Sequence, residues 1–120
     1  MKMDVKELIN KITTQLIRSG CEIIKGSTGI STSGTTIYFD NTLDDYDFVL
    51  IGASWGVGGV VTGYIYVPVV WWTGTTDVIK VYLNNNPSND SLTIKNRDNS
   101  KATISSSNAN VACQVMGIRL

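Results

Sequence analysis

Histidine is absent from the 120 residues of this chain. The commonest general base of enzymes, the Ser-His-Asp and Cys-His catalytic arrangements and most transition-metal sites are therefore excluded. The two cysteines have no companion ligands and are too few for a zinc site. From these absences we expect a protein that is not an enzyme and that needs no cofactor or metal.

An excess of either charge is also absent, because ten basic residues balance ten acidic ones. Without a broad positive field the chain has little to hold a phosphate backbone, so we expect no nucleic-acid partner. No apolar run is long enough to cross a bilayer, and charged residues stand near the start, where a signal peptide has its apolar core. We expect synthesis in the cytoplasm, no signal peptide and no membrane insertion.

Cysteine is scarce, with Cys21 and Cys113 alone. A disulfide between them would close a long loop and stabilise the fold by up to ~4 kcal/mol. A protein made in a reducing compartment keeps most of its thiols reduced, and such thiols are usually buried. We therefore favour two reduced, buried thiols over a disulfide.

Apolar residues make up 42% of the chain and charged residues only 17%, a mixture typical of one domain built from short strands and turns. The stretch that organises it is residues 46–53, which is aromatic and β-branched, and apolar on both strand faces from Phe48 to Ile51. Such a strand must be covered on two sides. The run at residues 64–72 is placed to return against it as a hairpin across the glycine-rich segment 56–59.

Residues 4–18 are predicted to form an amphipathic helix. Asp4 and Glu7 have the spacing of a capping box, and Gly20 follows as a stop signal. A single helix of this length is not stable alone in water, so its apolar stripe must pack on the β domain or on copies of itself, and both alternatives stay open. The candidate oligomerisation residues on this stripe are Val5, Leu8, Ile12 and Leu16. We divide the chain into this packing or oligomerisation element, residues 1–20, and a β domain, residues 21–120.

The rest of the chain predicts short strands separated by polar turns. We expect a short strand or linker at 21–25, a flexible loop at 26–34, and strands at 35–39, 76–83, 92–94, 102–104 and 111–120. No helical segment recurs between the strands, which disfavours a parallel sheet. The expected fold is mainly β: an antiparallel β-sandwich, jelly-roll-like, preceded by one N-terminal amphipathic helix.

Four aspartates cluster around one predicted turn: Asp40, Asp44, Asp45 and Asp47. One interpretation is a calcium site or a catalytic carboxylate pair, because hard cations take several oxygens from a short loop. The spacing does not match the EF-hand loop, and aspartate is a common turn former that bonds its own backbone. We favour a structural turn.

Aromatic residues on the predicted strands and their connections are the candidates for recognition, since such rings with nearby amides are common in carbohydrate and protein interfaces. Trp71 and Trp72 are adjacent, so in a strand one would enter the core and the other would face outward. Sequence alone does not say which. The candidate ligand contacts are Trp55, Tyr64, Tyr66 and Trp72.

The segment IYFDNTLDDYDFVLIGAS, the aromatic-rich strands after it and the ending VMGIRL resemble small structural proteins of tailed bacteriophages and prophages. The resemblance is to β-sandwich tip or head domains of tail-fibre and baseplate receptor-binding proteins and covers residues 35–120. It is carried by a Leu-x-x-Tyr corner, here Leu43 to Tyr46, and by a Gly-Ile-basic-apolar ending, here residues 117–120.

This resemblance implies a non-enzymatic virion protein, made in the bacterial cytoplasm and assembled as a homotrimer with other tail proteins. It would bind a host-surface saccharide or a neighbouring virion protein. One alternative is a carbohydrate-binding module of a bacterial secreted or surface enzyme. Another is an enzyme that uses the Asp40–Asp47 cluster.

Overall fold

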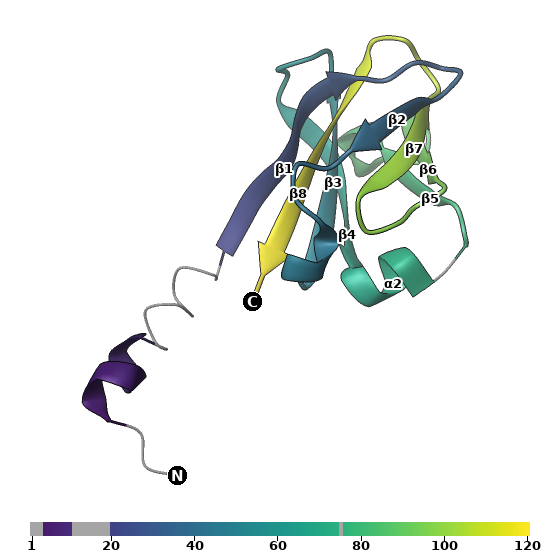
Figure 1. The fold of residues 1–120 in the computed structure, drawn as a ribbon. Helices are drawn as coiled ribbons and strands as arrows, with labels where there is room; N and C mark the ends of the chain where they lie inside the picture. Colours follow the sequence, from purple (N-terminus) through teal and green to yellow (C-terminus); the bar gives the residue numbers. More distant parts are fainter. Residues whose placement is uncertain (1–3, 11–19, 75) are drawn as a thin grey trace.

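The structure is a computed structural model in which residues 4–10, 20–74 and 76–120 are described. Beyond the N-terminal helix, these residues form eight strands, one short helix and two 3-10 turns (Figure 1). In chain order they are β1 (Gly20–Gly29), β2 (Thr35–Tyr38), η1 (Leu43–Asp45), β3 (Phe48–Trp55), β4 (Val61–Pro68), α2 (Val69–Gly74), β5 (Ile79–Tyr82), η2 (Leu83–Asn85), β6 (Ser91–Lys95), β7 (Lys101–Ser106) and β8 (Val111–Arg119).

The strands form two four-stranded antiparallel sheets that pack face to face as a sandwich. Sheet A has the order β1-β8-β3-β4, and sheet B has the order β2-β7-β6-β5. The first two strands pair with the last two in nested order, β1 with β8 and β2 with β7. The expected mainly-β, antiparallel sandwich is confirmed.

β3 lies inside sheet A, between β8 and β4, as expected for the organising strand. Its inward side chains Val49, Ile51 and Ala53 are fully buried in the core between the sheets. Its outward side chains Phe48 and Leu50 are only half-buried. The cover expected on both faces is therefore complete on one face only.

The predicted hairpin is present, because β3 pairs with β4 from Phe48 opposite Pro68 to Ser54 opposite Val61. The returning strand, however, ends at Pro68, and the rest of the predicted run is the helix α2. Proline donates no ladder hydrogen bond, and the next amide, that of Val69, donates to the Asp47 carbonyl at 2.9 Å. The prediction of a strand through residue 72 is wrong.

β1 is longer than expected and takes in much of the segment predicted to be a flexible loop. It pairs with β8 alone, and its register shifts between Ile23 and Lys25 and again between Lys25 and Thr28. These bulges accommodate a polar, glycine-containing strand at the sheet edge, where irregular pairing is tolerated. Ile30, just beyond β1, is buried in the core.

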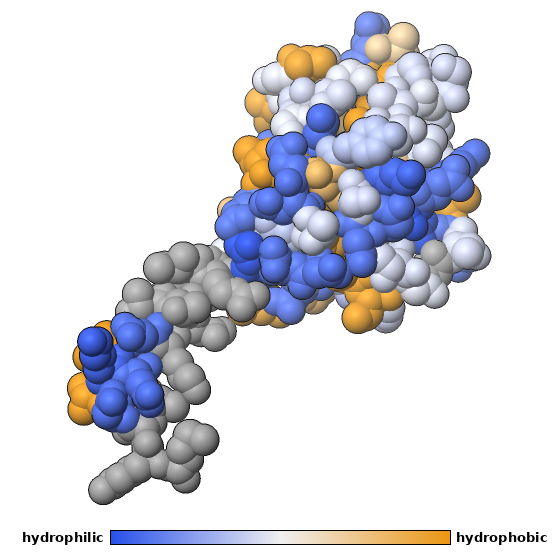
Figure 2. Space-filling model, viewed as in Figure 1, coloured by the Kyte–Doolittle hydropathy of each residue, from blue (hydrophilic) through white to orange (hydrophobic). Residues whose placement is uncertain are grey.

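The described part of the predicted N-terminal helix is helical from residue 5 to residue 10. Asp4 caps it, because its Oδ1 accepts a hydrogen bond from the Glu7 amide at 2.8 Å. Figure 2 shows hydrophobic side chains on one side of this helix, and Val5, Leu8 and Ile9 are exposed. The other two candidate oligomerisation residues, Ile12 and Leu16, lie outside the described residues. No helix in the described ranges is long and apolar enough to cross a membrane.

The two cysteines are free and stand at different heights of sheet A. Cys21 is opposite Ile118, and Cys113 is opposite Thr28. The two positions are five steps apart along β8, roughly 16 Å, which is too far for a disulfide. Cys113 is buried as expected, whereas Cys21 is exposed, so the prediction of two buried thiols is wrong for Cys21. Burial raises the pKa of the Cys113 thiol to about 12.

Candidate functional site

Trp55 is the last residue of β3 and stands at the turn into β4. Gly56 and Gly58 both have a φ of 79°, a left-handed conformation that glycine adopts without strain. The Gly56 amide donates to the carbonyl of Asn110 at 2.6 Å. This bond fixes the turn after β3 to the turn before β8, so Trp55 and Asn110 are held at the same end of the sandwich.

A hollow of about 430 Å³ opens between these turns. Its lining comes from three turns of the chain: Gly29, Trp55, Gly56, Val57, Ala109, Asn110 and Val111. Trp55 is 46% exposed, so a large part of the indole is open to solvent. An exposed indole beside a side-chain amide can stack on the apolar face of a sugar ring while the amide exchanges hydrogen bonds with its hydroxyls.

Tyr64 and Tyr66 are brought together on the outer face of sheet A, away from the turns that hold Trp55. Their rings meet edge to face with centroids 5.6 Å apart, and both side chains are half exposed. With Leu50 and Met116 they line a second hollow of about 220 Å³. Gly52 lies at its base, where an added Cβ would come within 2.8 Å of Val61.

Trp72 cannot contact a surface ligand, because its side chain is fully buried. Its Nε1 donates to the Asp98 carbonyl at 2.9 Å, and the Arg97 guanidinium lies 5.5 Å from its ring centroid. The prediction of Trp72 as a ligand contact is wrong. The exposed member of the pair is Trp71, which is 65% exposed on α2.

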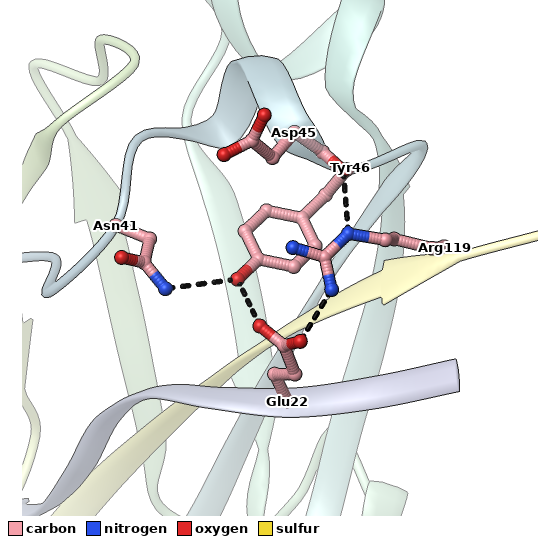
Figure 3. A network of polar contacts seen from close by, with 5 residues as sticks. All are labelled: Glu22, Asn41, Asp45, Tyr46 and Arg119. Carbon is pink, nitrogen blue, oxygen red and sulfur yellow. Dashed lines mark hydrogen bonds and ion pairs between the residues drawn. The ribbon is translucent and has the colours of Figure 1, made fainter. Parts of the chain in front are cut away.

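A polar cluster joins Tyr46 to both ends of the β domain (Figure 3). The Tyr46 hydroxyl donates to Glu22 at 2.6 Å and accepts from Asn41 at 3.2 Å. Arg119 forms an ion pair with Glu22, donates to the Asp45 carbonyl at 3.0 Å and stacks 4.5 Å above the Tyr46 ring centroid. The hydrogen bond from Tyr46, followed by that from Arg119, lowers the pKa of Glu22. Burial and the bond to Glu22 raise the pKa of Tyr46.

Members of the predicted aspartate cluster form a turn and contact the last residues of the chain. Asp44 and Asp45 lie in η1, and the Asp47 carboxylate accepts the Leu120 amide at 2.8 Å. In the described ranges, no three Cys, Asp or Glu side chains stand close enough to hold a metal ion. These contacts fit the favoured interpretation of a structural turn.

The sequence reasoning missed Asn110 and Val57 as partners of Trp55. Asn110 stands in a polar segment and Val57 in a glycine-rich one, and the composition of both segments predicts only a turn. What joins them to Trp55 is the pairing of β3 with β8, which sets Trp55 opposite Val111. No local signal in the sequence indicates that pairing.

Comparisons with known proteins found no matching family model, no matching curated protein and no matching solved structure.

Proposed function

We propose that this chain is a non-enzymatic recognition domain of a bacteriophage or prophage tail, the tip of a tail fibre or baseplate receptor-binding protein. It assembles as a homotrimer in the virion with other tail proteins and binds a saccharide on the host surface. The observation that carries the saccharide assignment is the Trp55 hollow, where an open indole lies beside Asn110.

The phage assignment draws support from the residues that carry the resemblance. Tyr46 of the Leu-x-x-Tyr corner packs on Gly117 and under Arg119 of the chain ending. Leu43 is fully buried, and its carbonyl accepts the Tyr46 amide at 3.0 Å. The two motifs therefore belong to one packed unit, so their joint occurrence has a structural reason.

The saccharide assignment is tested with Trp55→Ala. We expect the unaltered protein to bind a bacterial surface polysaccharide or its fragments on a glycan array and on host cells. Loss of the stacking surface is expected to weaken that binding by about tenfold or more, equivalent to about 1.4 kcal/mol. Binding is measured by array signal and by titration calorimetry with the best fragment.

Trp71→Ala is the matched control, because it removes an exposed tryptophan from α2, at the other end of β3. This variant is expected to bind like the unaltered protein. Equal binding by Trp55→Ala would exclude the hollow, and the absence of any saccharide ligand for the unaltered protein would exclude the ligand class.

A further inference from the structure

The outer faces of the two sheets differ in chemistry. On sheet B most of the residues that alternate with the buried positions are polar or charged, such as Lys80, Thr93 and Lys101, and the aromatic ones are Tyr38 and Tyr82. This alternation is typical of an antiparallel sheet with one face in water. Sheet A lacks it over the half that ends at Phe48, where the outward positions are apolar on all four strands; nearer Trp55 the outward Gln114 of β8 is polar.

One row of aligned residues crosses the whole outer face of sheet A. The row follows from the pairing of β1 with β8, of β8 with β3 and of β3 with β4. Its members, one from each strand, are Ile23, Met116, Leu50 and Tyr66. Ile23 is 54% exposed and Tyr66 is similarly open. Four apolar side chains in register, from edge to edge of the sheet, make a continuous apolar strip facing solvent.

The neighbouring row continues this strip. It consists of Cys21, Ile118, Phe48 and Pro68. Cys21 is exposed and its thiol lies 3.9 Å from the Met116 sulfur, so it belongs to the same face. On the other side of the first row, Tyr64 adds a wall to the hollow of about 220 Å³ that indents the face.

We propose that the outer face of sheet A is a self-association surface and that its occupant is a second copy of this chain. Glu22 and Arg119 alternate with the outward Cys21, Ile23 and Ile118, so they belong to the other side of the sheet, where they pair with each other, and the face meets its partner mainly by apolar contact. The net charge of the chain is zero, so two copies do not repel each other.

The size of the face fits this occupant only if a second contact contributes. Four strands about 4.8 Å apart and three rows about 6.6 Å apart give roughly 400 Å². A stable interface buries about 800 Å² on each partner, so sheet packing alone supplies about half. The exposed side chains Val5, Leu8 and Ile9, in the helix that precedes β1, are an apolar surface of the same chain that can supply more. The inferred interface therefore combines sheet A with the N-terminal helix.

The test is the concentration dependence of the mass in solution, measured on the whole chain by light scattering and sedimentation velocity. The unaltered protein is expected to associate between micromolar and millimolar concentration. Ile23→Lys places a charge on an exposed position of edge strand β1 and should weaken association at least tenfold. Tyr38→Lys, on a 62% exposed position of edge strand β2 in sheet B, is the matched control and should associate normally.

Cys21 reports on the face directly. The high pKa and burial of Cys113 keep that thiol silent, so labelling of the native protein reads Cys21. Its labelling rate should fall as the unaltered protein associates and stay constant for Ile23→Lys. A protein that is monomeric at every concentration would overturn the proposal. Association at a constant Cys21 rate, or Cys21 protection already present in a monomer, would do the same.

This inference deepens the assembly part of the proposed function; it rests on the outer face of sheet A and the N-terminal helix and does not involve the Trp55 hollow. Ile23→Lys is expected to keep saccharide binding, and Trp55→Ala is expected to keep self-association. Failure of one assignment is therefore distinguishable from failure of the other.

Discussion

Gly117 is the position in β8 on which the Tyr46 ring lies. A Cβ built there would come within 2.6 Å of ring atoms of Tyr46, which is too close for two carbon atoms that are not bonded to each other. The ring is held from its other side by Arg119 and at its hydroxyl by Glu22. It has little freedom to move away, and this explains why the smallest residue stands here.

Gly117→Ala is therefore expected to destabilise the protein by about 1–3 kcal/mol, the usual cost of overpacking a tight contact. Urea unfolding followed by fluorescence measures the change. Gly26→Ala is the control, because a Cβ there meets nothing within 4 Å, and it should leave the midpoint unchanged or slightly higher. Equal midpoints for Gly117→Ala and the unaltered protein would show that Tyr46 is not held in place.

At the scale of elements, α2 is where the sequence prediction failed most clearly. Residues 69–72 are β-branched and aromatic, a composition that favours a strand, and Pro68 was the one local sign that the strand ends. The helix is favoured by tertiary contacts, because it turns Trp72 into the end of the core near Phe39 and Arg97. Contacts with residues so far apart in sequence cannot be predicted from a local pattern.

The adjacent tryptophans of α2 give a matched pair of substitutions. Trp72→Ala removes a fully buried ring and leaves the Asp98 carbonyl without its donor, so we expect a loss of about 3–5 kcal/mol. Trp71→Ala, at a mostly exposed position, should cost less than about 1 kcal/mol. Thermal and urea unfolding of both variants check this difference. A reversed order would contradict the burial described for α2.

For the whole molecule, alternation and turn residues were enough to predict the class of fold and the β3–β4 hairpin. The edge strand β1 was underestimated, because its glycine, serine and threonine content is that of a loop, and only its pairing with β8 makes it a strand. The ligand contacts Trp55, Tyr64 and Tyr66 stay a prediction: all three are exposed, but Tyr64 and Tyr66 line a different hollow from Trp55, and the grouping of Trp55 with Asn110 depends on strand order. Strand order is set by contacts across the entire chain and leaves no local trace.

The cluster of Glu22, Tyr46 and Arg119 links three distant parts of the β domain: the first strand, the turn before β3 and the last strand. The lowered pKa of Glu22 makes this link sensitive to acid. Its contribution to stability is complete above the ordinary glutamate value of 4.5 and is lost as the pH falls through the lower pKa of the folded protein.

Glu22→Gln tests this linkage. The variant should be less stable than the unaltered protein at neutral pH, and the difference should shrink as the pH falls below about 4.5, where Glu22 takes up its proton in the unfolded chain before it does so in the folded protein. Unfolding midpoints across a pH series measure the effect. A difference that stays constant at all pH values would mean that the charge of Glu22 plays no part.

The direction of β3 has a consequence for how the molecule meets its surroundings. The strand runs from Phe48, beside Ile118, to Trp55, beside Val111, and covers about 25 Å. Gly20 lies opposite Arg119, so the chain enters and leaves the sandwich at one pole. A partner that binds the protein at either of these ends therefore holds it at that pole, and the indole of Trp55 is then exposed at the opposite pole.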